Sequence, residues 1–244
     1  HCWKEEGHGD LNLQESIEQS CDIYFYEIAH RIGVDKLAMY AHKFGLGEVT
    51  GVELPESKGL MPTKEWKYNR FGRRWQQGET LITGIGQGYT LCTPLQLAVM
   101  TARLATGKKL NPSYVNDTPL DMTTIKDLDV QPAHLRLVQD AMHNVVRSPY
   151  GTAFSARSRQ IDMAGKTGTS QVVSKRWDED TKLEDIPENE RTNALFVGYA
   201  PYDAPRVATA VVMENAGSGA KAAAPIARLA METALAHLQE KEQS

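Results

Sequence analysis

The feature of this sequence that most constrains its fold is the order of its periodic segments. Apolar residues recur at helical spacing up to residue 146, whereas short runs rich in small and β-branched residues, typical of strands, begin only after residue 160. Helices followed by antiparallel strands and a closing helix are typical of an α+β fold, with an antiparallel sheet flanked by helices. No internal repeat or linker divides the chain, so the sequence predicts a single domain over residues 1–244. The expected helices span residues 12–32, 36–44, 94–106, 132–146 and 225–238, and the expected strands span residues 161–164, 194–199 and 207–213.

Composition narrows the class of protein. The 244 residues carry a formal net charge of −4 and are 41% hydrophobic, which is ordinary for a globular chain able to bury a large core. The sequence has no apolar run of about 18 residues, and its mild acidity argues against nucleic-acid binding. Three cysteines are too few for a disulfide scaffold. Because the chain starts at His1 without a signal peptide, we expect it to be part of a longer protein whose N-terminal part is missing.

A basic and aromatic stretch follows the second expected helix. Residues 45–75 are rich in Gly, Pro and charge, and we expect them to be mostly loop. A charge run of this kind is usually a solvated face, with anionic lipid or a partner protein as the alternative. Trp66, Trp75 and Trp177 have the chemistry to line a glycan or peptide groove, although partial burial is the simpler interpretation. The basic residues of the stretch are Lys58, Lys64, Lys67, Arg70, Arg73 and Arg74.

The sharpest local signal is the run Ala-Gly-Lys-Thr-Gly-Thr-Ser at residues 164–170, at the end of the first expected strand. Glycines beside Lys166 let the backbone approach a ligand closely, and the hydroxyls of Thr167 and Thr169 offer hydrogen bonds to a carboxylate. A backbone N–H after such a strand can form half of an oxyanion hole. The tripeptide Lys166-Thr167-Gly168 is weak evidence by itself, because such tripeptides also mark ordinary strand ends.

A second polar motif, Ser20-Cys21-Asp22, stands at the boundary between two helical stretches. Ser and Asp favour caps and turns, so an ordinary helix break is the simpler interpretation. A serine hydroxyl beside a polar acceptor can instead transfer a proton during acyl transfer. With variations, the two motifs match two of the three markers of penicillin-binding proteins and class A β-lactamases, namely Ser-x-x-Lys, Ser-Asp-Asn and Lys-Thr-Gly.

Six blocks extend this match over nearly the whole chain, from residue 2 to about residue 238. The sequence closely resembles the penicillin-binding protein 2 family, the class B transpeptidases of cell elongation in Gram-negative bacteria. Six blocks in one order are far more specific than a single tripeptide. They are residues 3–9 (Trp-Lys-Glu-Glu-Gly-His-Gly), 20–26 (Ser-Cys-Asp-Ile-Tyr-Phe-Tyr), 43–47 (Lys-Phe-Gly-Leu-Gly), 84–89 (Gly-Ile-Gly-Gln-Gly-Tyr), 93–96 (Thr-Pro-Leu-Gln) and 165–169 (Gly-Lys-Thr-Gly-Thr).

The resemblance implies the penicillin-binding and serine β-lactamase-like fold, and peptidoglycan D,D-transpeptidase activity of the D-Ala-D-Ala carboxypeptidase class. In that family the serine of Ser-x-x-Lys attacks the penultimate D-alanine carbonyl of a stem peptide and expels the terminal D-alanine. The acyl group then passes to an amine of a neighbouring strand, and β-lactams acylate the same serine. The resemblance assigns proton relay to Ser20, positive potential to Lys166, and carboxylate binding to Thr167 and Thr169 around Gly168.

One marker is missing from the expected order, because no Ser-x-x-Lys tetrad precedes Ser20. The string Ser-Gly-Ala-Lys at residues 218–221 comes after Lys166, and a glycine-rich turn before a helix is its better interpretation. We therefore expect the nucleophile upstream of residue 1, and we expect this fragment alone to be inactive. Asp22 stands where many relatives carry Asn. We count it with Ser20 and Lys166 as catalytic and as a marker of the elongation subtype, with a charge that partly offsets Lys166.

Cys2, His8 and Cys21 carry side chains that bind zinc, at spacings of 6 and 13 residues that match no common zinc-finger pattern. In the resembled family, an upstream aspartate joins three ligands at the matching positions. The resemblance therefore implies zinc in the intact protein with the fourth ligand absent from this chain, and acyl transfer itself requires no metal. A Cys2–Cys21 disulfide in an oxidising compartment, or a buried Cys21 with an exposed His8, remain the alternatives.

The resemblance also implies partners and a location. The expected partners are peptidoglycan stem peptides, β-lactam antibiotics and membrane proteins of the elongation complex, including a glycosyltransferase, with no nucleic acid. The expected location is the periplasmic face of the bacterial inner membrane, with the membrane anchor outside this chain. Three other functions stay open: a serine β-lactamase or D,D-carboxypeptidase, a β-lactam-sensing receptor, and a non-catalytic scaffold of cell-wall assembly, which the absent nucleophile favours.

Overall fold

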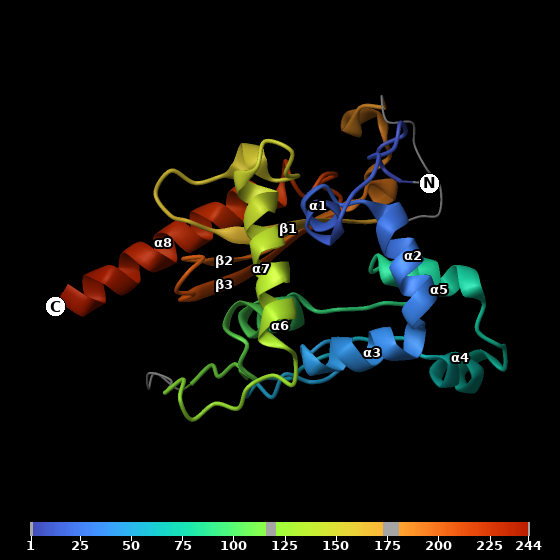
Figure 1. Ribbon diagram of the computed structural model, residues 1–244, viewed down its shortest axis with the longest axis horizontal. Helices are drawn as coiled ribbons and strands as arrows, with labels where there is room; N and C mark the ends of the chain where they lie inside the picture. The colour runs from blue at the N-terminus through green and yellow to red at the C-terminus, as the bar shows by residue number, and fades with distance from the viewer. Residues whose placement is uncertain (1, 116–120, 173–180, 244) are drawn as a thin grey trace. The chain divides into compact units, whose positions relative to one another are not determined.

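The computed structural model describes residues 2–115, 121–172 and 181–243, and Trp177 lies outside these ranges. The chain forms two compact units, residues 1–138 and residues 139–244, with the boundary inside one long helix. The described part holds helices before strands and a last helix after them, which confirms the α+β order predicted from the sequence (Figure 1). The single domain expected over residues 1–244 stays a prediction.

The first unit is helical, and its helix ends follow the local sequence. The helix expected at residues 94–106 is present: Thr93 accepts a hydrogen bond from the Gln96 amide, Pro94 occupies the first turn, and Gly107 ends the helix in the left-handed conformation. Gly84 packs against Ala29 so closely that a Cβ at position 84 would lie 2.4 Å from the Ala29 Cβ. The helices are α1 (Leu13–Glu18), α2 (Asp22–Ile32), α3 (Val34–Lys43), α4 (Lys64–Phe71), α5 (Gln77–Gly84), α6 (Pro94–Thr106) and α7 (Pro132–Arg147), the last continuing into the second unit.

Residues 45–75 are mostly loop, as predicted, but they also contain the helix α4, which was not predicted from the sequence. The hydroxyl of Thr63 caps α4 by accepting a hydrogen bond from the Trp66 amide at 3.0 Å, and Gly72 ends it at φ 65°. Lys, Glu and Arg are good helix formers. In this stretch, however, their high density resembles a solvated loop, and the few apolar residues of the helix are hard to recognise among them.

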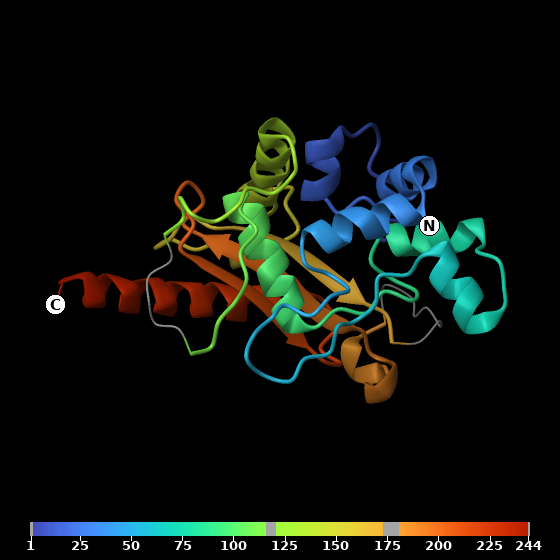
Figure 2. The same ribbon diagram turned by 90° about the horizontal axis from the view of Figure 1, so that it is seen from below.

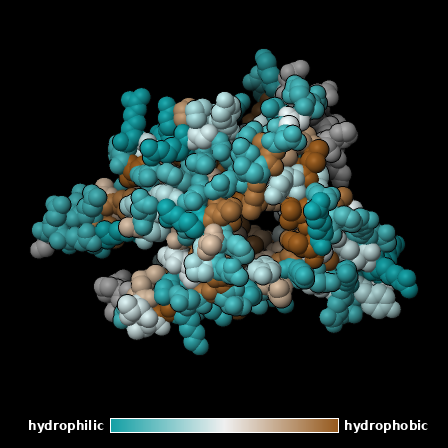
Figure 3. Space-filling view, in the orientation of Figure 1, coloured by the Kyte–Doolittle hydropathy of each residue, from teal (hydrophilic) through white to brown (hydrophobic). Residues whose placement is uncertain are grey.

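The second unit is built on a three-stranded antiparallel sheet in the order β1-β2-β3. Its strands are β1 (Ala164–Ser170), β2 (Asn193–Ala200) and β3 (Val207–Met213), and α8 (Ala223–Gln243) packs on β2 and β3. In Figures 1 and 2, α8 runs alongside the strands and continues beyond them, and Figure 3 shows a hydrophilic surface at its C-terminal end. None of the described helices combines the length and the apolar character needed to cross a bilayer.

The core of the second unit lies between this sheet and α8. The ring of Phe196 on β2 and the side chain of Met231 on α8 are almost completely buried. The ring of Tyr199 is also buried, but on the opposite face of β2, because side chains alternate along a strand. Small residues on α8 recur every three or four positions and let the helix approach the sheet closely. This stripe consists of Ala223, Ala224 and Ala227, continued by Met231 and Leu235.

The first strand differs from its prediction. The sequence predicts residues 161–164, but β1 begins at Ala164 and ends at Ser170, so the Lys-Thr-Gly motif forms the strand instead of following it. Gly and Lys have low strand propensity, which argues locally for a strand end. Continuous pairing with β2, from Ala164 opposite Tyr199 to Ser170 opposite Asn193, overrides that preference.

Candidate active site

One half of the predicted site is the strand β1, an edge strand of the described sheet. Lys166 pairs with Val197 and Gly168 with Leu195, so the antiparallel ladder fixes the position of each motif residue along the strand. Side chains alternate along a strand, which places Thr167 and Thr169 on one face and Lys166 on the other. The outer edge of β1 presents backbone N–H and C=O groups, and an extended peptide can pair with such an edge.

The motif side chains on β1 have local partners. The Lys166 ammonium donates to the backbone carbonyl of Thr167 at 3.1 Å. The Thr167 hydroxyl lies 2.7 Å from the hydroxyl of Thr152, and the pair shares a hydrogen bond. Sequence reasoning missed Thr152, because nothing in its own surroundings marks it and its partner is 15 residues away. Its contact orients the Thr167 hydroxyl that the sequence predicts as a carboxylate ligand.

Glycines allow this strand to pack closely against its neighbours. A Cβ at Gly165 would lie 2.2 Å from the ring of Phe196, and a Cβ at Gly219 would lie 2.3 Å from the carbonyl oxygens of Gly168 and Leu195. Residues 218–221 form a turn directly before α8, with the amides of Lys221 and Ala222 donating to the Ser218 carbonyl. This confirms the interpretation of that string as a glycine-rich turn.

The other half of the predicted site is the break between α1 and α2. Ser20 has φ 54°, a left-handed conformation that is uncommon for a residue with a side chain. The Cys21 amide donates to the Ser16 carbonyl at 3.0 Å, and Cys21 is the N-cap of α2. Asp22 opens α2, where the helix dipole favours a negative charge. The backbone therefore turns sharply at Ser20 and places Asp22 at a helix N-terminus.

Trp3 holds this break in place and was not predicted as a site residue. Its indole Nε1 donates to the Ser20 carbonyl at 2.9 Å, and its backbone amide donates to the Asp22 carboxylate at 3.2 Å. Its ring also meets the His8 ring edge to face, with centroids 5.4 Å apart. The only sequence signal was its place in the first matched block.

The structure brings Cys2, His8 and Cys21 together beside the helix break. Their ligand atoms all lie within 4.8 Å of one another, and the Cys2 Sγ lies 3.5 Å from the His8 Nδ1. Both thiols are buried and free, and among the described residues His8 Nε2 is buried without a hydrogen-bond partner. Burial raises the pKa of the Cys21 thiol above its ordinary value, and the backbone N–H of Tyr24 opposes that shift. Two soft sulfur donors and an imidazole at this spacing fit zinc.

The structure thus places the predicted residues in two groups. Ser20, Asp22 and the three metal-type ligands belong to the first unit, whereas residues 166–169 belong to the second unit. Within each unit the structure groups the residues as described above, and their catalytic, binding and metal-ligand roles stay predictions. The meeting of the two groups in one site stays a prediction.

Comparison with known proteins covers almost the whole chain. A family model described as the penicillin binding protein transpeptidase domain matches residues 1–232. The peptidoglycan D,D-transpeptidase MrdA of Haemophilus influenzae is 37% identical over 247 residues, covering 94% of this chain and 37% of the relative. This chain therefore spans little more than a third of the length of that relative.

Two solved structures share the fold. A Helicobacter pylori penicillin-binding protein (PBP2) in complex with MreC matches with a TM-score of 0.84 and 34% identity, over 98% of this chain and 42% of that one. A Pseudomonas aeruginosa PBP2 in complex with WCK 5153 matches with a TM-score of 0.82 and 36% identity, over 96% of this chain and 51% of that one. These matches confirm the predicted transpeptidase fold.

Proposed function

Because this chain belongs to the penicillin-binding protein transpeptidase domain family, we propose that its full-length protein is a peptidoglycan D,D-transpeptidase of cell elongation. The observation that carries this proposal is the Lys166-Thr167-Gly168-Thr169 run on an edge strand of the antiparallel sheet. The similarity to a D,D-transpeptidase at 37% identity supports it further. In this proposal the protein acts on D-Ala-D-Ala stem peptides and is acylated by β-lactams.

The residues of β1 would bind the donor peptide. The backbone edge of β1 offers hydrogen bonds to an extended peptide, and the hydroxyls of Thr167 and Thr169 offer hydrogen bonds to its terminal carboxylate. The Lys166 ammonium adds positive potential where negative charge develops on the carbonyl oxygen. These groups orient the substrate and stabilise charge, and none of them has to form a covalent bond.

The reaction itself is an acyl transfer through a serine ester. The serine oxygen bonds to the penultimate D-alanine carbonyl carbon, the amide C–N bond breaks, and the leaving D-alanine amine takes up a proton. Ser20 would relay that proton, because its hydroxyl both accepts and donates. An amine of a neighbouring strand then attacks the ester, and the serine leaves with a proton. The nucleophilic serine is expected on sequence upstream of residue 1.

Acylation by a fluorescent penicillin tests this function in the full-length protein. We expect Lys166→Ala to lower the acylation rate constant by about 10²–10³-fold, as loss of one group that stabilises developing charge typically does. The matched control is Ser218→Ala, which removes the serine of the out-of-order string, and we expect it to acylate at the wild-type rate. Labelling at Ser218, or near-normal acylation of Lys166→Ala, would overturn these assignments. Rapid hydrolysis of the penicillin would instead indicate a β-lactamase.

We also propose that the full-length protein binds zinc through Cys2, His8 and Cys21. The convergence of their three ligand atoms within 4.8 Å supports this proposal. Zinc would neutralise the thiolates and tie residues 2–8 to the start of α2. Among the described residues the group has three members. The family resemblance implies the fourth ligand, an aspartate upstream of residue 1.

Elemental analysis of the full-length protein tests the metal, with a thiol count as the second readout. We expect close to one zinc per chain, and a loss of zinc together with a lower melting temperature in Cys21→Ser. Cys92→Ser is the matched control, because Cys92 lies outside the group. A zinc content near zero under non-chelating conditions would contradict the proposal. Two missing thiols would favour the Cys2–Cys21 disulfide instead.

The proposed partners follow from the same family. The Helicobacter pylori PBP2 structure is a complex with MreC, which supports assembly of the full-length protein with proteins of the elongation complex. We place its activity at the periplasmic face of the inner membrane, with a glycosyltransferase supplying the glycan strands. Co-purification of the full-length protein with its own elongation proteins from detergent-solubilised membranes tests this. Recovery of the transpeptidase alone under several mild detergents would contradict it.

A further inference from the structure

A pocket of about 630 Å³ lies in the first unit, between the end of α4 and the start of α5. Four of its lining residues belong to the basic and aromatic stretch of the sequence, which the proposed catalysis does not use. Its volume falls in the range of about 300–1,000 Å³ that small-molecule and peptide-sized ligands occupy. The residues that line it include Lys67, Phe71, Arg73, Arg74, Glu79 and Tyr89.

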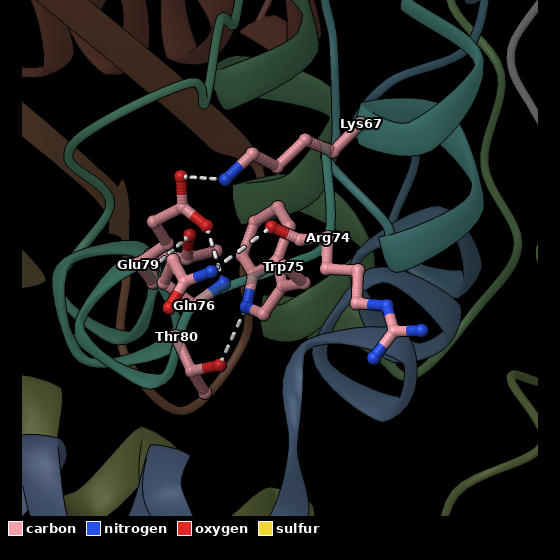
Figure 4. Close-up of polar contacts among 7 residues, drawn as sticks. Lys67, Arg74, Trp75, Gln76, Glu79 and Thr80 are labelled. Atoms are coloured by element: carbon pink, nitrogen blue, oxygen red, sulfur yellow. Dashed lines mark hydrogen bonds and ion pairs between the residues drawn. The ribbon is translucent and has the colours of Figure 1, made fainter. Parts of the chain in front are cut away.

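The lining contains one internal ion pair. The Lys67 ammonium bonds the Glu79 carboxylate, and their side chains are only 6% and 21% exposed (Figure 4). Glu79 also accepts a hydrogen bond from the Gln76 amide at 2.6 Å. Burial alone would raise the pKa of Glu79, but the hydrogen bonds from Lys67 and Gln76 outweigh it and hold that pKa below its ordinary range. The ion pair therefore has no net charge, and each of its two charged groups has the other as its partner.

Two further cations at the pocket are not neutralised in this way. Arg73 and Arg74 directly follow Gly72, which ends α4 in the left-handed conformation. Both side chains are exposed, and within the described residues their guanidinium groups make no ion pair. In Figure 4 the guanidinium of Arg74 points away from the Lys67–Glu79 pair. The pocket therefore presents a net positive charge to a ligand.

An aromatic cluster backs the same pocket. The rings of Phe71 and Tyr89 are 5.8 Å apart, and the Trp66 ring meets Tyr89 at 5.2 Å. Trp75 donates a hydrogen bond from its indole nitrogen to the Thr80 hydroxyl at 2.8 Å, which fixes its ring (Figure 4). Trp66 and Trp75 are half-buried supports of this wall, as the simpler sequence interpretation has it, while Phe71 is 48% exposed.

We propose that this pocket binds a short acidic peptide, with carboxylates on Arg73 and Arg74 and an aliphatic part against Phe71 and Tyr89. A guanidinium presents a planar fork of donors that matches a carboxylate, and adjacent arginines suit a ligand with two of them. A free phosphate would use the arginines alone, whereas a peptide also uses the aromatic wall. The inference deepens the proposed function and rests on it for the source of the peptide, a peptidoglycan stem peptide with free carboxylates.

Titration of the full-length protein with the stem tetrapeptide L-Ala-γ-D-Glu-meso-diaminopimelate-D-Ala tests this, by isothermal calorimetry at low salt. We expect Arg73→Gln/Arg74→Gln to weaken binding by about tenfold or more, because two charge-assisted contacts are lost. The matched control, Lys36→Gln/Arg70→Gln, removes the same charge from exposed positions that do not line the pocket. We expect it to change the affinity by less than about twofold, as screened surface charges do.

Changing the peptide instead of the protein tests the inference even if a variant folds poorly. On the wild-type protein, the same peptide with its carboxylates amidated should bind at least about tenfold more weakly. Equal binding of the amidated peptide, equal loss in both double variants, or inorganic phosphate binding as tightly as the peptide would each overturn the inference. Penicillin acylation without peptide binding would overturn the inference and leave the proposed function standing. Peptide binding without acylation would support the pocket and contradict the proposed function.

Discussion

The two units of this chain differ in the polar side chains that they bury, although both bury apolar ones. Among the described residues of the first unit, nine polar or charged residues are buried, and the part of the second unit that the structure describes buries none of these types. The second unit instead buries Ala, Val, Met, Phe and Tyr side chains and brings backbone into contact at glycines. The nine are Ser16, Glu18, Thr50, Lys67, Thr80, Thr83, Gln96, Thr101 and Arg103.

These buried polar groups have specific partners. Arg103 donates to the carbonyls of Leu110 and Lys43 and to the amide oxygen of Asn111, so one guanidinium joins the end of α3 to the loop that follows α6. The Gln96 amide donates to the carbonyls of Glu48 and Lys58. The first unit has much irregular backbone, and these side chains satisfy carbonyls that no strand or helix pairs.

Different interactions therefore stabilise the two halves of the proposed site. The helix break that carries Ser20 is held by hydrogen bonds, which a single isosteric change can remove. The strand that carries Lys166 is held by backbone pairing with β2 and by close packing at glycines, which a single added methyl group can disrupt. We therefore expect the first unit to be sensitive to lost partners and the second to added volume.

The largest expected effect on stability is the loss of a buried ionic partner in the first unit. Glu79→Gln leaves the Lys67 ammonium, 6% exposed, without its carboxylate, and we expect a loss of about 3–5 kcal/mol in the free energy of unfolding. Urea unfolding measures it. Glu27→Gln is the matched control, because its pair with Arg31 is exposed, and we expect no measurable change. Similar curves for the two variants would show that buried polar pairs do not support this unit.

The next largest expected effect is a loss of stability when volume is added to the second unit. Gly219→Ala would place a Cβ 2.3 Å from two backbone oxygens of β1 and β2, and we expect it to destabilise the protein by about 1–3 kcal/mol. Gly78→Ala adds the same atom within α5 of the first unit, where nothing lies within 4 Å. We expect that control to be neutral or to stabilise by about 0.4–1 kcal/mol, measured by the same urea unfolding. A Gly219→Ala protein as stable as Gly78→Ala would break the comparison.

Where local signals were complete, the sequence predicted the structure closely. The strand at residues 207–213 has its predicted ends, and α6 matches because Thr93, Pro94 and Gly107 all mark its limits. One prediction failed where a distant contact decides, and another failed where a high charge density obscured a local helix signal. The strand β1 extends through Gly and Lys because β2 pairs with it, and α4 forms in a stretch whose charges resemble a loop.

Prediction of the site residues from the sequence was limited in the same way. Its motif residues were identifiable because they are contiguous or lie in matched blocks. Trp3 and Thr152 were missed because their partners, Ser20 and Thr167, are 17 and 15 residues away and no local pattern links them. The grouping of Cys2, His8 and Cys21 rested on their ligand chemistry and on a family resemblance, since their spacing matches no common zinc-finger pattern.

A smaller effect tests the support of the helix break. Trp3→Phe keeps an aromatic ring beside His8 but removes the indole hydrogen bonds to the carbonyls of Ser20 and Gln19. We expect a loss of about 1 kcal/mol in stability and faster hydrogen exchange at the amides of residues 20–22. Unchanged exchange at these amides would show that the break holds its shape without Trp3.

The smallest expected effect is a pH dependence of the first unit. The pKa of Glu79 lies below its ordinary value of 4.5, so its stabilising contribution is complete above that pH and is lost as the pH falls through the lower folded value. Unfolding measured across this acid range should therefore show the stability gap between wild type and Glu79→Gln narrowing with falling pH. A gap that stays constant would contradict this assignment.

A double-mutant cycle on acylation tests most directly whether Ser20 and Lys166 act in one site. The second-order rate constant for a fluorescent penicillin is measured for Ser20→Ala, Lys166→Ala and the double variant, each in the full-length protein. If both side chains serve the same transition state, the double variant should react within about tenfold of the slower single variant. Losses that multiply in full, or a Ser20→Ala protein that acylates at the wild-type rate, would show that the two units do not share one catalytic centre.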